Sequence, residues 1–296
     1  MKRAAMVIAV LGVVVLGMCA WSFGQSTTKP AAQNPPAGQA AQPAGQAAAP
    51  AGKRAPAAKT VPEFDAYKAA VAQTDPAALE KAADDFATKF PDSELRGPLY
   101  TVAVQRYQQA NNADKMVDMA KKVLAIDADD PAALVGVAQA LAERTRDTDL
   151  DKDEQRAEAK KDAERALVTI DTDVPTTGYS VEQLNGFKGF IRSEAYFILG
   201  TLAFKASNWA DAETNLRKSI EALPQQPDTV AVFRLAVALD MQDKLPEAMK
   251  YIDQAVDLTK DRPDSGVGKA AREEKDRLTK RSGGTAPATT ATPPKN

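Results

Sequence analysis

Residues 193–262 read SEAYFILGTLAFKASNWADAETNLRKSIEALPQQPD and then TVAVFRLAVALDMQDKLPEAMKYIDQAVDLTKDR, which is one pattern written twice. In each copy, two runs of apolar residues at helical spacing flank a short polar break, which predicts two helices joined by a turn. The residues that match between the copies lie 36 positions apart: Leu199 with Leu235, Gly200 with Ala236, Trp209 with Leu245, and Ala212 with Ala248. Self-similarity at this period predicts a helical repeat protein.

The repeated unit resembles the tetratricopeptide (TPR) repeat, which is about 34 residues long and folds as a helical hairpin. With position 1 at Ser193, the first copy carries the large, small and proline residues of that family at Tyr196, Leu199, Gly200, Ala212, Leu216 and Pro224. Ala203 departs from the family, which has an aromatic residue at that position. The resemblance implies an all-α solenoid of stacked hairpins, whose first helices line a concave groove.

The same pattern extends over the rest of the folded body, which we expect to span 61–281. We predict five hairpins and a C-terminal capping helix, at 61–93, 97–130, 131–172, 193–228, 229–262 and 264–281. The acidic insert 146–153 delays the second helix of the third hairpin to about residue 157. Ser180 and Gln183 form a capping-box pattern, which predicts that the helix through Ser193 begins well before that residue.

The N-terminal segment 1–24 has a basic start, an apolar run and small residues at Ser22 and Gly24. This pattern favours a signal peptide cleaved before Gln25. An uncleaved membrane anchor and a lipoprotein acylated at Cys19 remain alternatives. Each of them places the body outside the cytoplasm, in the periplasm or facing it. Residues 25–60 and 282–296 are rich in small residues and proline, and we expect a disordered linker and tail.

Composition excludes several classes of function. The chain has no histidine, and its one cysteine is Cys19, so the body lacks a Ser-His triad, a His-ligated metal and a thiolate nucleophile. Between 61 and 281 there are 31 basic and 40 acidic residues, an acidic balance that argues against nucleic-acid binding. We therefore expect a non-enzymatic protein that uses no cofactor.

One acidic stretch has the spacing of a calcium loop. Carboxylates at Asp147, Asp149, Asp151, Asp153 and Glu158 match the oxygen ligands of an EF-hand-like frame. Lys152 stands where such a loop requires glycine, so we favour a solvated acidic loop, with calcium binding as the alternative.

The resemblance also implies which side chains point into the groove. The predicted partner-binding residues are Gln105, Gln109, Gln139, Phe197, Phe204, Phe233 and Met241, and further groove positions are Gln108, Glu143, Thr201, Lys205, Val237 and Asp240. The Lys, Asn and Arg set with which TPR proteins clamp acidic C-terminal peptides is absent, so we expect apolar anchors for a peptide or helix. The alternative is that neighbouring helices cover these side chains.

The function predicted from the sequence is that of a non-enzymatic TPR adaptor in the bacterial cell envelope, which presents its groove to a protein or peptide. The ending Phe90-Pro91-Asp92-Ser93 resembles TPR-like repeats of envelope-assembly proteins. A second hypothesis is an accessory or spacer subunit of an envelope assembly or export complex. A hydrolytic or calcium-dependent protein is a third. Contact with a membrane is expected only through the N-terminal segment.

Overall fold

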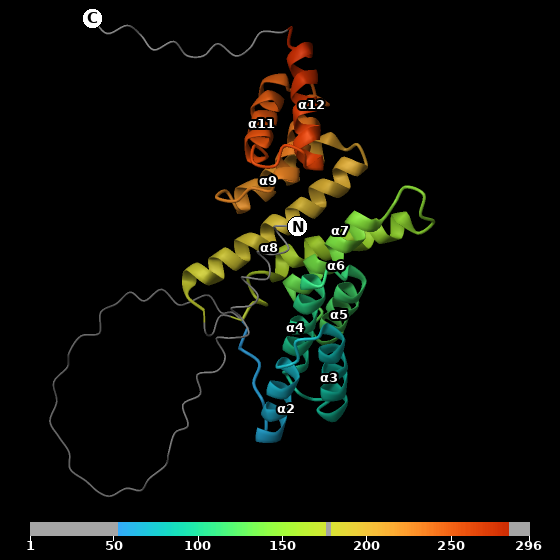
Figure 1. Cartoon of the computed structure of the whole chain (residues 1–296), viewed down its shortest axis with the longest axis vertical. Helices are drawn as coiled ribbons and strands as arrows, with labels where there is room; N and C mark the ends of the chain where they lie inside the picture. Colours follow the sequence, from blue (N-terminus) through green and yellow to red (C-terminus); the bar gives the residue numbers. More distant parts are fainter. Residues whose placement is uncertain (1–52, 176–178, 284–296) are drawn as a thin grey trace, which may run out of the picture.

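The computed structural model describes residues 53–175 and 179–283, and all regular elements in these ranges are helices (Figure 1). They are α2 (Val61–Val71), α3 (Pro76–Lys89), α4 (Arg96–Gln109), α5 (Ala113–Ile126), α6 (Pro131–Arg144), α7 (Lys152–Thr169), α8 (Val181–Lys205), α9 (Trp209–Ala222), α10 (Thr229–Asp240), α11 (Leu245–Leu258) and α12 (Gly266–Arg281). The predicted all-α class and helical-hairpin solenoid are confirmed. None of these helices is long and apolar enough to cross a membrane. The predicted signal or anchor segment and the tail from residue 284 lie outside the described residues.

Side chains at the helix starts explain where most of the helices begin. Asp75, Asp130 and Asp228 each accept a hydrogen bond from the backbone N–H three residues on, at 2.7–2.8 Å. Such an N-cap satisfies a donor that the first turn leaves unpaired. Proline follows at the first helical position after Asp75 and Asp130, where its missing N–H has no cost.

Three hairpins turn in the same way, which gives the sequence repeat a structural counterpart. Asn111, Ser207 and Asp243 have positive φ angles of 54°, 56° and 58°. The next residue in each turn donates its N–H to the carbonyl five positions back, at 2.9, 2.9 and 3.0 Å. This is the Schellman arrangement, which satisfies the free carbonyls at a helix C-terminus. The turns at Ser207 and Asp243 lie 36 residues apart, the spacing of the sequence repeat.

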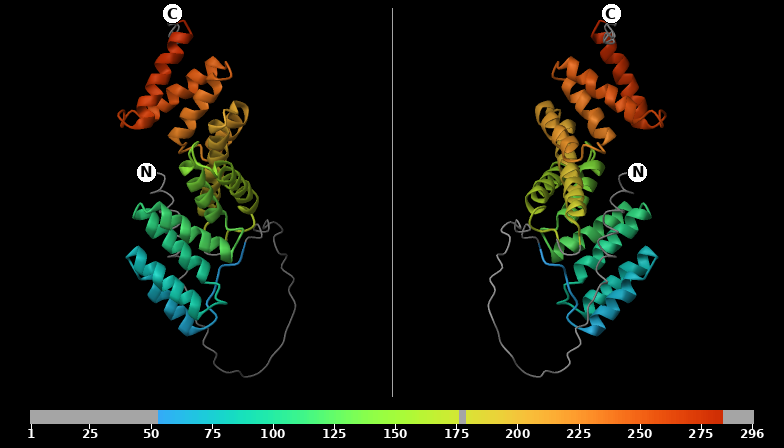
Figure 2. Two further views of the ribbon diagram at one scale, coloured as in Figure 1. Left: turned by 90° about the vertical axis from the view of Figure 1, so that its right-hand side faces the viewer. Right: turned by 90° about the vertical axis from the view of Figure 1, so that its left-hand side faces the viewer.

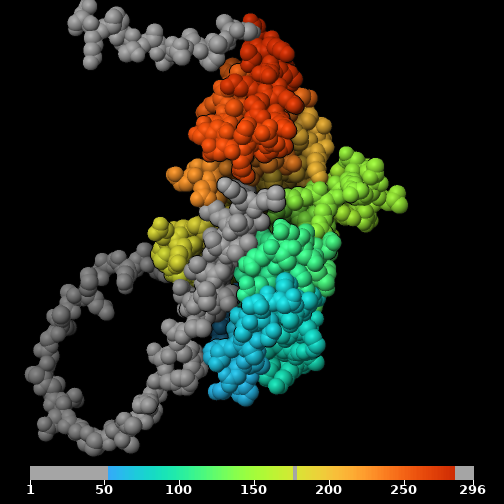
Figure 3. Space-filling model, viewed as in Figure 1, coloured from blue at the N-terminus to red at the C-terminus, as the bar shows by residue number. Residues whose placement is uncertain are grey.

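The hairpins stack end to end, from α2–α3 to α12 (Figure 2). Three clusters of buried apolar side chains follow one another along the stack, the first from α2 to α6, the second from α6 to α8 and the third from α8 to α12. Helix α8 packs on α6, α7, α9 and α10 and so joins the two halves. The loop between α6 and α7, with fully exposed Leu150, projects from the side of the stack (Figure 3).

Several boundaries can be compared with the predictions. The predicted long helix is present as the 25 residues of α8, and Ser180 and Gln183 form its capping box. Helix α12 begins at Gly266 after the N-cap Ser265, two residues after the predicted start of the capping helix at 264. Helix α7 starts at Lys152, about five residues before its predicted start. Residues 53–60, which were predicted to be disordered, are held against the body through ion pairs of Lys53 and Arg54.

The two helices of a hairpin approach one another closely at Gly200, where α8 meets α9. A Cβ atom on this glycine would lie 2.7 Å from Cγ of Leu216 and 3.2 Å from its backbone nitrogen. Leu216 is fully buried, so it has little room to move away. Glycine therefore sets the spacing of the two helices, which explains why the repeat requires a small residue here.

We predict that Gly200→Ala lowers the free energy of unfolding by about 1 kcal/mol or more, because overpacking outweighs the gain in helix propensity. Gly186 lies on the same helix, and a Cβ there would meet nothing within 4 Å. Gly186→Ala should accordingly raise the stability by about 0.5–1 kcal/mol. Urea titrations followed by circular dichroism measure both variants. Equal effects of the two substitutions would contradict close packing at Gly200.

Candidate functional site on the first-helix face

The candidate site is the first-helix face, which we define as the surface formed by α4, α6, α8 and α10, the first helices of four consecutive hairpins. The sequence places the predicted groove residues on these helices. In the structure the residues fall into two groups. A glutamine-bearing part lies on α4 and α6, and an aromatic part lies on α8 and α10.

The three predicted glutamines have different environments. Gln105 is 7% exposed, and its side-chain nitrogen has no hydrogen-bond partner among the described residues. Gln109 is exposed and accepts a hydrogen bond from Arg106 at 3.3 Å. Gln139 is half-buried, donates to Glu143 at 3.3 Å and lines a small cavity of about 80 Å³ beside α8. Gln139 therefore lines a hollow on this face, and a partner role for any of the three stays a prediction.

The aromatic residues are also unequally accessible. Phe197 is only 8% exposed and belongs to the third buried cluster, because α10 packs against α8 at this point. Phe204 and Phe233 are half-buried and pack against the same cluster. Met241, at the end of α10, is 52% exposed. The expected row of exposed anchors is therefore reduced to the edges of Phe204 and Phe233 and the side chain of Met241.

A cation that the sequence analysis did not place in the groove lies among these rings. The guanidinium of Arg234 is 5.4 Å from the ring centroid of Phe197 and 5.9 Å from that of Phe204. It donates a hydrogen bond to the hydroxyl of Thr201 at 2.6 Å. It forms no ion pair with a carboxylate of the described residues, and burial lowers its pKa. We call Phe197, Thr201, Phe204 and Arg234 the Arg234 surface.

Arg217 shows how another half-buried guanidinium that lies over an aromatic ring is compensated in this protein. It lies over the ring of Tyr251, with 5.3 Å to the centroid, and it is paired with Glu213 and Glu247. A guanidinium loses much of its hydration on burial, and a carboxylate restores the lost interactions. Arg234 has the aromatic partners, and Asp228 and Glu143 act on it electrostatically, but neither forms an ion pair with it, so its charge is only partly compensated.

Lys205 adds to the positive charge beside this surface. Its ammonium donates to the backbone carbonyl of Ala142, at the end of α6, at 2.6 Å. Burial lowers the pKa of Lys205, and the charges of Arg156 and Arg234 lower it further. Lys205, which was predicted to point into the groove, therefore joins α8 to α6 through this hydrogen bond. Its positive charge also makes the surrounding region more favourable for an anion.

Asp240 does not face the groove as its repeat position implies. Its carboxylate is 1% exposed and pairs with Arg277 and with Arg281, both on α12. The family positions assume that the first helix of another repeat follows, whereas here α12 packs against α10 and α11. The terminal helix thus covers this part of α10, and Asp240 is a structural residue.

The acidic residues of the possible calcium loop are not brought together. Asp147 pairs with Arg156 at 2.6 Å, and this hydrogen bond lowers the pKa of its carboxyl group. Asp149 accepts a hydrogen bond from the backbone N–H of Arg146 at 2.8 Å. Asp151 precedes α7, and Asp153 and Glu158 lie on that helix. In the described part of the chain, no group of three acidic, histidine or cysteine residues could hold a metal ion.

Comparisons with known proteins give little further guidance. No protein-family model and no curated protein matches the chain. Among solved structures, the chain is similar to one described as "Assembly Chaperone of RpL4 (Acl4) (Residues 1-338)". The two share 13% identity over 75% of this chain and 98% of that chain, with a TM-score of 0.37. At this level, the likeness describes a general arrangement of helices and does not indicate what this chain binds.

We predict that Asp240→Asn lowers the free energy of unfolding by about 1–3 kcal/mol, because it weakens charge-assisted hydrogen bonds to two arginines at a buried position. Asp243→Asn is the matched control, since Asp243 pairs with Arg281 but its side chain is 82% exposed. That change should cost less than about 1 kcal/mol. Chemical denaturation measures both. A larger loss at Asp243 would show that α12 is not held through Asp240.

Proposed function

We propose that this protein is a non-enzymatic helical-repeat protein of the TPR type, which binds an acidic segment of a partner protein at the Arg234 surface. The observation that carries the proposal is the partly buried guanidinium of Arg234, which is stacked on two rings and has no paired carboxylate in the described chain. A carboxylate from a partner would complete this arrangement.

The expected binding energy has two sources. A carboxylate that meets a desolvated guanidinium forms charge-assisted hydrogen bonds worth about 1.5–3 kcal/mol. Apolar side chains beside that carboxylate can pack on the edges of Phe204 and Phe233 and on Met241, which lies two turns from Arg234 on the same side of α10. This proposal modifies the expectation from the sequence, which assigned affinity to apolar anchors alone.

The cellular setting in this proposal rests on the sequence. The segment 1–24 has the pattern of an export signal or anchor, and we therefore place the body in the periplasm or facing it. The non-enzymatic role rests on the absence of histidine from the chain and of cysteine from the body. TPR membership is supported by the repeat of 36 residues and by the equivalent turns at Ser207 and Asp243.

A second candidate function is that of a spacer in an envelope assembly or export complex. The observation in its favour is the end-to-end stack, in which α8 connects the two halves (Figure 1). A spacer would use the two ends of the stack and would not depend on Arg234. The two candidates can therefore be separated by changing this residue alone.

The test is a selection of random linear peptides on the purified full-length protein, followed by affinity measurement with Arg234→Met. We expect the selected peptides to contain Asp or Glu next to an apolar residue. Methionine retains the apolar stem but lacks the charge, so the variant should bind these peptides about tenfold more weakly or worse. Its far-ultraviolet circular dichroism spectrum should be unchanged.

Arg217→Met is the matched control, because it also removes an arginine over an aromatic ring, but on α9 and α11. It should leave peptide affinity unchanged. Selected peptides without acidic residues, or equal affinity for the wild-type protein and Arg234→Met, would contradict the proposed site. The spacer hypothesis predicts that no peptide family is enriched.

A further inference from the structure

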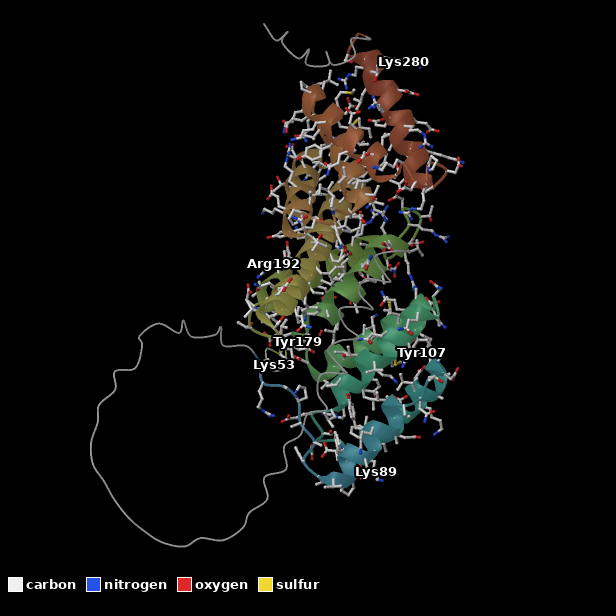
Figure 4. The ribbon with its side chains drawn as sticks, turned by 60° about the vertical axis from the view of Figure 1, so that its left-hand side comes forward. Lys53, Lys89, Tyr107, Tyr179, Arg192 and Lys280 are labelled. Carbon is white, nitrogen blue, oxygen red and sulfur yellow. The ribbon has the colours of Figure 1, made fainter. Side chains whose placement is uncertain are left out.

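A second and larger cavity lies at the other end of the first-helix face, away from the Arg234 surface. Its volume is about 690 Å³, which is in the range of small-molecule sites. Its walls come from the segment before α2, from α2, from the start of α4, from the α5–α6 junction, from residues 173–175 and Tyr179, and from the first two turns of α8. Figure 4 shows two of its lining residues, Lys53 and Tyr179, close together near the start of α8.

Most of the cavity wall is apolar. The larger apolar side chains on it are Tyr67, Val123, Ile126, Tyr179, Leu184 and Phe187. Desolvation raises the pKa of Tyr179 to about 12, which agrees with the apolar surroundings of its ring. A volume of about 690 Å³ is large enough to hold many water molecules. Replacing that water by an apolar molecule is favourable, because apolar walls and apolar ligand leave water together.

The polar groups of the cavity are concentrated where the segment 53–56 crosses it. The ammonium of Lys53 pairs with Asp127 and lies 3.7 Å from Asp173. Asp130 lines the same wall and is close enough to raise the pKa of Lys53 electrostatically. Even without Asp130, two carboxylates face one ammonium. Beside them, Arg54 and Glu94 form a pair that neutralises itself.

This distribution of charge determines the head group that a ligand can have. A carboxylate or phosphate head would add to this surplus of negative charge, whereas an amine would supply a second cation for the two carboxylates that face the single ammonium of Lys53. An amine head would therefore lie near Asp127 and Asp173, with its apolar body against Leu184 and Phe187. The polar and apolar parts of the cavity thus match the two parts of an amphiphile.

A peptide strand fits this cavity less well. An extended chain brings an amide group every 3.3 Å or so, and each buried amide requires a hydrogen-bond partner. The charged groups at the rim are already bonded to one another, and most of the remaining wall is apolar. An alkyl or aromatic body has no such requirement.

We propose that the cavity formed by the segment 53–56, the α5–α6 junction and the start of α8 binds a small amphiphile with an amine head and an elongated apolar body. Lys53 marks the place of the head group. The site is independent of the Arg234 surface, so failure of one proposal leaves the other standing.

The test uses the full-length protein with the neutral dye Nile red, whose fluorescence rises in apolar surroundings. Dodecylamine, dodecanol and dodecanoate serve as competitors below their micellar concentrations. We expect dodecylamine to displace the dye at the lowest concentration and dodecanoate at a concentration about tenfold higher or more. Equal displacement by amine and acid would overturn the assignment of the head group.

Gly186 provides a variant that fills the cavity without endangering the fold. It lines the cavity on α8, and a Cβ there meets nothing within 4 Å, so a side chain can begin there without a clash and favours the helix. Gly186→Leu should weaken dodecylamine binding about tenfold or more, and Gly186→Ala less than about twofold. Gly266→Leu, on α12, makes the same change at an open position far from the cavity and should have no effect. Unaltered binding in Gly186→Leu would show that the amphiphile binds elsewhere.

A second pair of variants tests the charge at the rim. Asp173→Asn should remove most of the preference for dodecylamine over dodecanol, because it deletes one of the carboxylates that face the head group. Asp171→Asn is the matched control, since Asp171 pairs with Lys188 and Arg192 and does not line the cavity. A preference that persists in Asp173→Asn, or that falls equally in both variants, would contradict the proposed position of the amine.

Discussion

The structure depends on how closely the two helices of each hairpin approach one another. Gly200 meets Leu216 at a distance that leaves no room for a Cβ atom, and fully buried alanines occupy the interiors of the other hairpins. The alanines with no exposed surface include Ala103, Ala120, Ala138, Ala163, Ala236 and Ala248. Because small residues bring the helices together, each hairpin is a thin unit that stacks on the next.

Helix α8 gives this stack its two candidate sites. Its C-terminal half belongs to the repeat and presents Phe197, Thr201 and Phe204 beneath Arg234 of α10. Its first two turns extend beyond the repeat and, with residues 173–175 and Tyr179, line one side of the large cavity. One long helix therefore positions an incompletely satisfied guanidinium at one end and an apolar cavity at the other.

Local features of the fold could be predicted because they depend on local chemistry. Ser180 and Gln183 indicated the start of α8, since both groups of the capping box lie within one helical turn. Leu199 and Gly200 indicated the repeat, since Leu235 and Ala236 match them 36 residues further on, which is the period of one hairpin. The start of the last helix was predicted to within two residues, since its N-cap Ser265 lies next to the turn that precedes it.

Long-range contacts could not be predicted in the same way. Asp240 was predicted to face the groove from its repeat position alone. Its partners, Arg277 and Arg281, lie 37 and 41 residues away on a helix that does not belong to a repeat, so the sequence did not indicate the pairing. Phe197 looked like an exposed anchor because the sequence does not reveal how closely α10 packs on α8. The one sequence signal for Arg234 was a cation inside the otherwise apolar run 230–239, and Arg234 is not at a groove position of the family. The cavity combines segments from 53 to 187, which no local pattern connects.

The most direct test of the central claim is an NMR titration that follows the side-chain Nε–H resonance of Arg234, assigned by its absence from Arg234→Met. The titrants are a selected acidic peptide and the same peptide with its acidic residue changed to the neutral amide. The account predicts that the resonance shifts with the acidic peptide, saturates with its binding, and stays in place with the amide form. Binding of the acidic peptide without any movement of the Arg234 resonance would contradict it.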